Sequence, residues 1–201
     1  MNHQLHRLGS LALILLALAA LLLPTIARAH VGVGETAGFV HGFGHPLGGI
    51  DHVFAMVAVG LWAAQRGERG LWLIPATFVL VMSLGGLIGT MGIVVPFVEQ
   101  GIVLSVLVLG VLIAAAVRLP LFASTLIVGL FAVFHGHAHG VEMPANTSGF
   151  AYGAGFVFAT AFLHGLGIGA ALLTRRFGQS GLVRLSGGVI AACGLYLWIA
   201  A

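Results

Sequence analysis

Histidine and acidic side chains gather in one short segment of the chain, His45-Pro46-Leu47-Gly48-Gly49-Ile50-Asp51-His52. Neutral imidazole is the commonest protein ligand for borderline divalent metals, and a carboxylate adds neutralising charge. We therefore expect His45 and His52 to bind a transition metal, with Asp51 offsetting its charge and orienting a histidine. The alternative is a helix entry held by an Asp–His hydrogen bond, without a ligand.

A second cluster, Phe134-His135-Gly136-His137-Ala138-His139-Gly140-Val141-Glu142, has the spacing of a helical metal site. On an α-helix His135 and His139 share a face, and Glu142 lies near it. His137 points elsewhere. A His-x-x-x-His pair is a common two-ligand platform. An extended segment would instead alternate its faces, and a chance His-rich loop would bind nothing.

His164 stands by itself deep in an apolar run. Ionisable side chains inside a membrane are costly and usually functional. His164 is either a core residue bonded to a backbone carbonyl or the next ligand along an inward path, and its depth favours the path. Glu99 either faces the same outer cavity or begins a helix in solvent. Glu35 and His41 are further candidates for gathering metal before the first span.

The rest of the chain is apolar, with 60% hydrophobic and 6% charged residues among 201. A soluble domain carries about 25% charged residues, so most of this chain must have lipid as its solvent. There is no lysine, and the eight arginines form no basic patch interleaved with aromatics. Nucleic-acid binding is thereby excluded. Cys193, the only cysteine, permits no intramolecular disulfide and has the pattern of a core residue.

Residues 1–29 have the pattern of a secretory signal peptide. Arg7 makes the start weakly positive, Leu11 to Leu23 is apolar, and Ala27-Arg28-Ala29 is a small-x-small cleavage site. Cleavage would leave His30 as the new N-terminus, where its α-amine and imidazole together form a chelating pair for Ni²⁺ or Cu²⁺. The alternative is a retained signal anchor.

Residues 30–201 are expected to form one all-α domain, a polytopic membrane helix bundle. A spanning helix needs about 20 mostly apolar residues. Six stretches qualify, and turns, prolines and polar loops separate them: Leu47–Gln65, Leu71–Gly92, Phe97–Val117, Pro120–Gly136, Phe150–Thr174 and Leu182–Ala201. Paired and regularly spaced glycines within the spans predict close helix packing.

Arginine marks one side of this bundle. All the arginines after the signal fall at alternate span ends, namely Arg66, Arg69, Arg118, Arg175, Arg176 and Arg184. By the positive-inside rule that side is the cytoplasm, which leaves both mature termini of an inner-membrane protein in the periplasm. Most histidines and acidic residues then lie near the periplasmic side. Four aromatic residues near span ends are expected to be interface anchors: Tyr152, Trp62, Trp72 and Trp198.

The two histidine motifs make the sequence resemble the HupE/UreJ family of nickel and cobalt permeases. The resemblance covers essentially the whole mature chain. The resemblance implies import of Ni²⁺ or Co²⁺, with Zn²⁺ less favoured, for hydrogenase or urease maturation by facilitated diffusion and without a prosthetic group. Its functional residues would be His45, Asp51, His52, His135, His137 and His139. One departure concerns the wider nickel/cobalt transporter class, which has His-x-x-x-x-Asp-His. Here five residues separate His45 from Asp51.

Three functions fit these residues. In a permease, outer ligands capture the ion, Asp51 and Glu142 offset its charge, and the ion passes inward beyond His164. A periplasmic metal buffer or sensor would have no use for a histidine so deep in the fifth span. The expected partners of a permease are a divalent metal ion and the bilayer, and the sequence carries no signal of oligomeric state.

An intramembrane zinc hydrolase is the third reading. Three histidines and an aspartate could hold a catalytic Zn²⁺ with an open water position. Polar helpers would be Ser83, Ser105 or Ser124. The chain lacks a helical His-Glu-x-x-His and has more histidines than one zinc requires, so we expect a protein that is not an enzyme.

Overall fold

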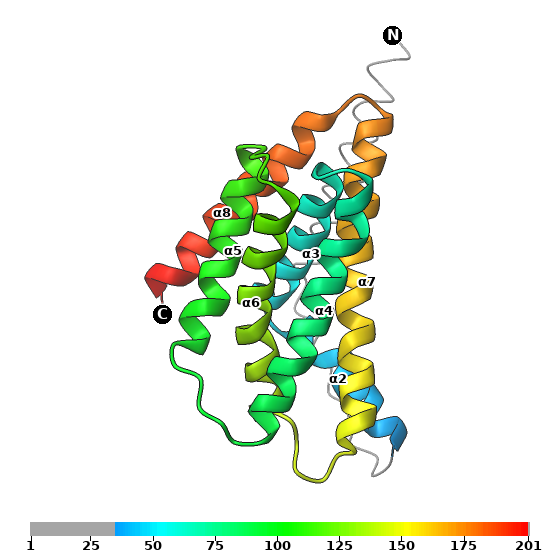
Figure 1. Ribbon diagram of the computed structural model, residues 1–201, viewed down its shortest axis with the longest axis vertical. Helices are drawn as coiled ribbons and strands as arrows, with labels where there is room; N and C mark the ends of the chain where they lie inside the picture. The colour runs from blue at the N-terminus through cyan, green and yellow to red at the C-terminus, as the bar shows by residue number, and fades with distance from the viewer. Residues whose placement is uncertain (1–34, 201) are drawn as a thin grey trace.

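The computed structural model describes residues 35–200, and this part of the chain is built from α-helices alone. Its helices are α2 (Glu35–Gly48), α3 (Ile50–Gln65), α4 (Glu68–Thr90), α5 (Val98–Ala114), α6 (Leu121–Val141), α7 (Gly149–Arg176) and α8 (Ser180–Ala200). They form one elongated bundle (Figure 1). The all-α prediction is confirmed. The predicted signal peptide and His30 lie outside the described residues.

The start of the predicted first span is wrong. Leu47 and Gly48 end α2, and α3 begins only at Ile50. The two helices are bent by 86° at this break. Gly49 has an extended backbone, with φ −107° and ψ 124°, which interrupts the helical hydrogen bonding. Pro46 lies inside α2, so the change of direction comes after the proline.

Helix α6 also differs from its predicted bounds. The predicted span ended at Gly136, whereas α6 continues to Val141 and carries the whole histidine motif. Residues 135–140 are all buried, so tertiary packing holds this last part of the helix in place. The extended alternative for the motif is therefore excluded.

Within the described part of the chain, four helices are long and apolar enough to cross a membrane, namely α4, α6, α7 and α8. The bent pair α2 and α3 would be a fifth span if it counts as one. Helix α5 is apolar and has 17 residues, at the lower end of the usual length. The predicted number of six spans requires both of these elements and stays a prediction.

Helix α3 is the centre of the bundle and is buried continuously from Val53 to Ala64. It meets α7 where Gly60 faces the backbone of His164, and Gly167 faces the backbone of Val57. Helices α4 and α6 approach as closely, with Gly136 against the carbonyl of Met82. Small residues allow such contacts between membrane helices, as the glycine pattern predicted.

Two of the four expected interface anchors are wrong. Trp62 is fully buried and Tyr152 is 4% exposed, whereas Trp72 and Trp198 are exposed. Trp62 is enclosed because α3 is surrounded by other helices, so its end does not face lipid. Tyr152 is covered by α2, a helix that the sequence pattern did not suggest.

The connections sort the polar residues between the two ends of the bundle. The α3–α4, α5–α6 and α7–α8 connections lie at the upper end in Figure 1, and α2 lies toward the lower end with the other two connections. The arginines at the C-terminal ends of α3 and α7 and in the α5–α6 connection therefore share one end. The histidines of α2, early α3 and late α6 share the other.

Candidate metal centre

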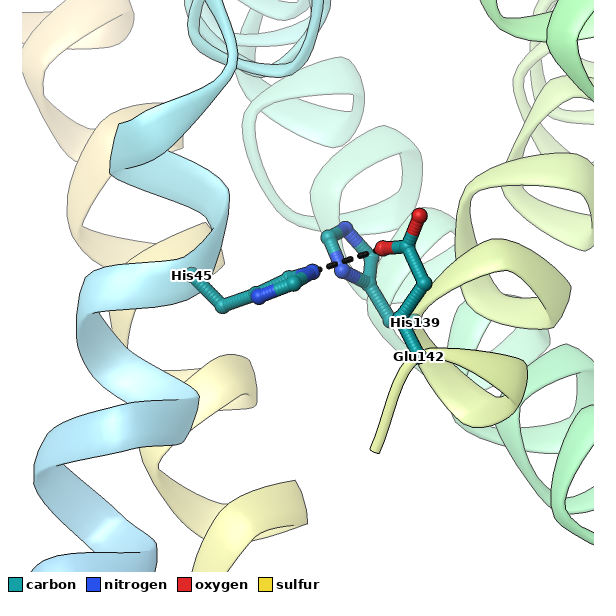
Figure 2. Close-up of side chains that lie close together, drawn as sticks. All are labelled: His45, His139 and Glu142. Carbon is teal, nitrogen blue, oxygen red and sulfur yellow. Dashed lines mark hydrogen bonds and ion pairs between the residues drawn. The ribbon is translucent and has the colours of Figure 1, made fainter. Parts of the chain in front are cut away.

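Three helices bring the predicted ligands together. Helix α2 carries His45 in its last turn, α3 carries Asp51 in its first turn, and α6 carries His139 in its last turn. In Figure 2 the imidazole of His45 points from α2 toward His139 on α6 and toward Glu142, the residue that follows α6. Because α2 and α3 meet at a bend, His45 on α2 and His52 on α3 both lie against the histidine motif of α6.

The outer part of the centre consists of His45, His139 and Glu142. Each offers one ligand atom, and these atoms lie within 4.8 Å of one another. His45 Nε2 donates to Glu142 Oε2 at 2.7 Å (Figure 2). Glu142 is exposed, whereas His139 is only 3% exposed. The group is therefore open to solvent through its carboxylate and enclosed on its histidine side, a geometry suited to capturing a cation.

His139 joins this outer group to deeper histidines. Its ring centroid lies 4.8 Å from that of His45 and 4.5 Å from that of His52. The ring of His52 in turn lies 4.9 Å from that of His135. The predicted sharing of one face by His135 and His139 is thus present, and His52 lies against both. A continuous row of four imidazoles leads inward from the exposed end.

Asp51 orients its neighbour His52. The Asp51 Oδ1 atom accepts from the His52 backbone N–H at 2.8 Å and from His52 Nδ1 at 2.9 Å. A carboxylate accepts hydrogen bonds, so we infer that Nδ1 carries the ring proton and that Nε2 keeps its lone pair. A carboxylate that sets the tautomer of a histidine in this way is typical of metal sites.

Ser105 orients His135 in a similar way. From the sequence, Ser105 is a candidate only as a polar helper in a zinc hydrolase. The Ser105 hydroxyl donates to the carbonyl of Ile102 at 2.6 Å, which uses its one proton. His135 Nε2 lies 3.0 Å from the same oxygen and must therefore be the donor. The lone pair of His135 is left on Nδ1. The sequence feature that could have indicated this role is a serine within the apolar run of α5.

Replacing Ser105 by alanine should weaken metal binding by about 10- to 100-fold, the usual cost of removing a group that orients a metal-binding histidine. The expected cause is loss of the contact that holds the His135 tautomer. Isothermal titration of the detergent-purified protein with Ni²⁺ measures it. Ser83→Ala is the matched control, because Ser83 is exposed and bonds only to the carbonyl of Val79 in its own helix. Equal affinities in the two variants would contradict this role.

The nitrogens facing this row have no hydrogen-bond partner among the described protein groups. They are buried, and comprise His52 Nε2, His135 Nδ1 and both ring nitrogens of His139. Leaving a buried polar group unsatisfied costs about 1–3 kcal/mol, and native proteins rarely do so without a reason. The two orienting contacts leave lone pairs on His52 Nε2 and His135 Nδ1, and a neutral His139 has one further lone pair on its ring. The donor set therefore fits a borderline divalent metal.

His164 lies farther along, beyond Phe78. The fully buried Phe78 ring has its centroid 5.6 Å from that of His135 and 5.1 Å from that of His164. Both nitrogens of His164 are buried without a partner within residues 35–200, so this part of the chain does not support the reading as a satisfied core residue. An aromatic side chain thus separates the four-imidazole row from the deepest histidine.

The remaining candidates lie outside the row. His137 is turned away, as expected, and its Nε2 donates to the carbonyl of Ile93 at 2.8 Å. His41 is half-buried one turn before His45 on α2, and Glu99 is exposed in the first turn of α5. Glu99 thus fits the helix-start alternative. Tyr152 was not among the predicted site residues, but its ring lies 6.0 Å from that of His45. Its buried hydroxyl has no hydrogen-bond partner among the described residues.

Comparison with known proteins shows the family of the chain. The model of the HupE / UreJ protein family matches residues 18–197, most of the chain. The chain belongs to the HupE / UreJ family. It is also 47% identical over 184 residues to Protein HupE of Rhizobium leguminosarum bv. viciae, a match that covers 90% of this chain and 95% of that protein. No solved structure matches it.

Membership in the HupE / UreJ family confirms the resemblance that was inferred from the two histidine motifs. With several apolar helices long enough to cross a bilayer, this HupE / UreJ chain is a multi-pass membrane protein. The family is one of transporters and accessory proteins, not of enzymes, so the hydrolase reading is set aside.

Proposed function

We propose that this chain imports Ni²⁺ or Co²⁺ across the inner membrane, for maturation of hydrogenase or urease, by facilitated diffusion along a path of histidines and carboxylates. Family membership supports the metal and its use. The observation that carries the proposal is the row of four imidazoles that leads inward from the solvent-open group at His45, with buried ring nitrogens of His52, His135 and His139 that no described protein group satisfies. His164 lies beyond this row, on the other side of Phe78.

The proposed path has three stages. Glu142 and His45 capture the hydrated ion, and the exposed carboxylate supplies negative charge. His139 then passes the ion to His52 and His135, where the Asp51 carboxylate offsets its charge. Phe78 is the barrier that must move before the ion reaches His164.

Conduction requires sites that bind an ion firmly enough to take it up and weakly enough to release it. Mixed sites of imidazole and carboxylate meet this requirement better than a thiolate cage. The single cysteine, Cys193, lies on α8, a helix that supplies none of the imidazoles in the row. Imidazole and carboxylate suit Ni²⁺ and Co²⁺ alike. These donors also accept Zn²⁺, so the expectation that Zn²⁺ is the weaker competitor rests on family membership and not on the donor set.

The arginine-rich end is proposed to face the cytoplasm, in accordance with the positive-inside rule. The histidine cluster then opens to the periplasm, and both mature termini are periplasmic. In this orientation a signal peptide at residues 1–29 would be cleaved outside the cytoplasm. His30 would then be available as an additional terminal ligand on the periplasmic side.

Radiolabelled Ni²⁺ uptake into proteoliposomes that contain the purified protein tests the proposal, with Co²⁺ and Zn²⁺ as competitors. Uptake is expected for the wild type and not for the double variant Asp51→Ala/His52→Ala, and Co²⁺ should compete better than Zn²⁺. Metal binding without uptake by the wild type would overturn the permease and favour a periplasmic buffer or sensor.

His164→Ala should lower uptake at least about tenfold while Ni²⁺ binding at the outer group remains, since His164 lies beyond Phe78. The same proteoliposomes measure transport, and equilibrium dialysis in detergent measures binding. Thermal unfolding confirms that the variant folds. A variant that transports at the wild-type rate would exclude His164 from the path.

A further inference from the structure

A second polar site lies at the end of the bundle opposite the histidines. It is a cavity of about 520 Å³ between the C-terminal ends of α3 and α7, the start of α8 and the α5–α6 connection. Four arginines line it: Arg66, Arg118, Arg175 and Arg184. Along α3, Arg66 is about 20 Å from His52, given the 1.5 Å rise per residue of a helix. The cavity is therefore separate from the proposed metal path.

The positive charge of this cavity is not balanced by the protein groups described. None of its described lining residues is Asp or Glu. Within residues 35–200 both ion pairs involve histidine, His45 with Glu142 and Asp51 with His52. Four guanidinium groups that stay charged at all physiological pH values thus converge on one space.

Backbone carbonyls hold three of these arginines in place. Arg66 Nη2 donates to the carbonyl of Leu119, and Arg184 Nε donates to that of Ala114 at 2.9 Å. Arg175 Nη1 makes a longer contact of 3.4 Å with the carbonyl of Ala64. A guanidinium has five N–H donors, so most remain unused, and Arg66 Nε is buried without a partner. The cavity therefore presents charged donors, and backbone carbonyls hold three of the four side chains that carry them.

We propose that this cavity binds a phosphate-bearing anion. Planar guanidinium groups recognise phosphate oxygens through paired, charge-assisted hydrogen bonds, and several converging arginines are the usual form of such a site. The phosphate can come from the headgroup of an anionic phospholipid or from a free phosphate. Basic pockets between transmembrane helices on the cytoplasmic side bind anionic headgroups. Exposed apolar side chains beside Arg175, namely Leu172, Leu173 and Phe177, suit adjoining acyl chains.

The positive-inside rule alone does not account for this convergence. It requires arginines near the cytoplasmic ends of the spans but no particular direction for their side chains. Arg69 and Arg176 satisfy it at the same end but do not line the cavity. A phosphate bound by the other four would join α3, α7, α8 and the α5–α6 connection at one point and stabilise this end of the bundle.

The test compares two double variants of the delipidated full-length protein in detergent. Arg118→Gln/Arg175→Gln removes two lining charges, and Arg69→Gln/Arg176→Gln removes two charges at the same end outside the cavity. Arg118 is exposed and Arg175 makes only one long contact, so the fold should survive. The probes are phosphatidylglycerol, phosphatidylcholine and inorganic phosphate, followed by native mass spectrometry and thermal unfolding.

For the wild type and the control variant we expect tight, stabilising binding of phosphatidylglycerol or of inorganic phosphate. Binding should weaken at least about tenfold in the lining variant, since each lost charged hydrogen bond costs about that much. Preference for phosphatidylglycerol over both phosphatidylcholine and inorganic phosphate identifies a lipid site, and saturable binding of inorganic phosphate identifies a free-anion site. Equal weakening in both double variants, or no phosphate-dependent binding by the wild type, would overturn the proposal. Nickel uptake is not a readout, so the result is independent of the proposed transport.

Discussion

Nickel binding at the outer group and nickel uptake should both be lost when His139 is replaced by glutamine. The His139 ring lies against both His45 and His52, with ring centroids 4.8 and 4.5 Å away. Its removal takes a ligand from the capture site and also interrupts transfer inward. We expect at least about a 100-fold loss of affinity, because even a supporting group around a metal costs about 10- to 100-fold.

The matched control for this experiment is His137→Gln. His137 lies on the same helix, is similarly buried, and donates to the carbonyl of Ile93 outside the row. A glutamine amide can still donate that hydrogen bond, so binding and uptake should remain near wild type. Titration calorimetry and proteoliposome uptake measure both variants. If the His137 variant loses as much activity as the His139 variant, the assignment of the row to one face of α6 is wrong.

Replacing Gly136 by alanine should strongly destabilise the protein. An added Cβ would overlap the carbonyl oxygen of Met82 on α4, a backbone atom that cannot rotate away. Overpacking of this kind costs about 1–3 kcal/mol, and the upper part of the range applies where backbone must move. The helix propensity of alanine returns up to about 1 kcal/mol, which offsets part of the cost.

Gly129→Ala provides the comparison on the same helix. The nearest atom to an added Cβ there is the Thr77 Cγ2 atom at 3.5 Å, an ordinary contact. This variant should unfold at or slightly above the wild-type temperature, whereas Gly136→Ala should unfold well below it. Circular dichroism of both proteins in the same detergent measures the difference. Similar unfolding temperatures for the two variants would mean that α4 and α6 are not as close at Gly136 as described.

Much of the metal centre could be predicted from local spacing. The i, i+4 relation of His135 and His139 places them on one face of any helix, and both do lie against His52. The expected direction of His137, away from that face, is also present. Such relations depend only on helix geometry within one element, so no knowledge of the neighbouring helices is needed.

Contacts between elements could not be predicted in this way. Ser105 and Phe78 approach the row from α5 and α4, which are apolar on all sides. In such a helix the hydrophobic pattern does not distinguish the side that meets protein from the side that meets lipid. Trp62 was misplaced for the same reason.

By itself, the sequence determined that this protein is an all-α membrane protein with two histidine motifs of metal-binding type, because composition and helical spacing are properties of the chain alone. Only the tertiary structure decided that the two motifs form one row. That result depends on the 86° bend at Gly49 and on the glycine contacts that draw the helices together. The convergence of four arginines on one cavity has the same origin, since it arises from how four separate segments pack and not from any one of them.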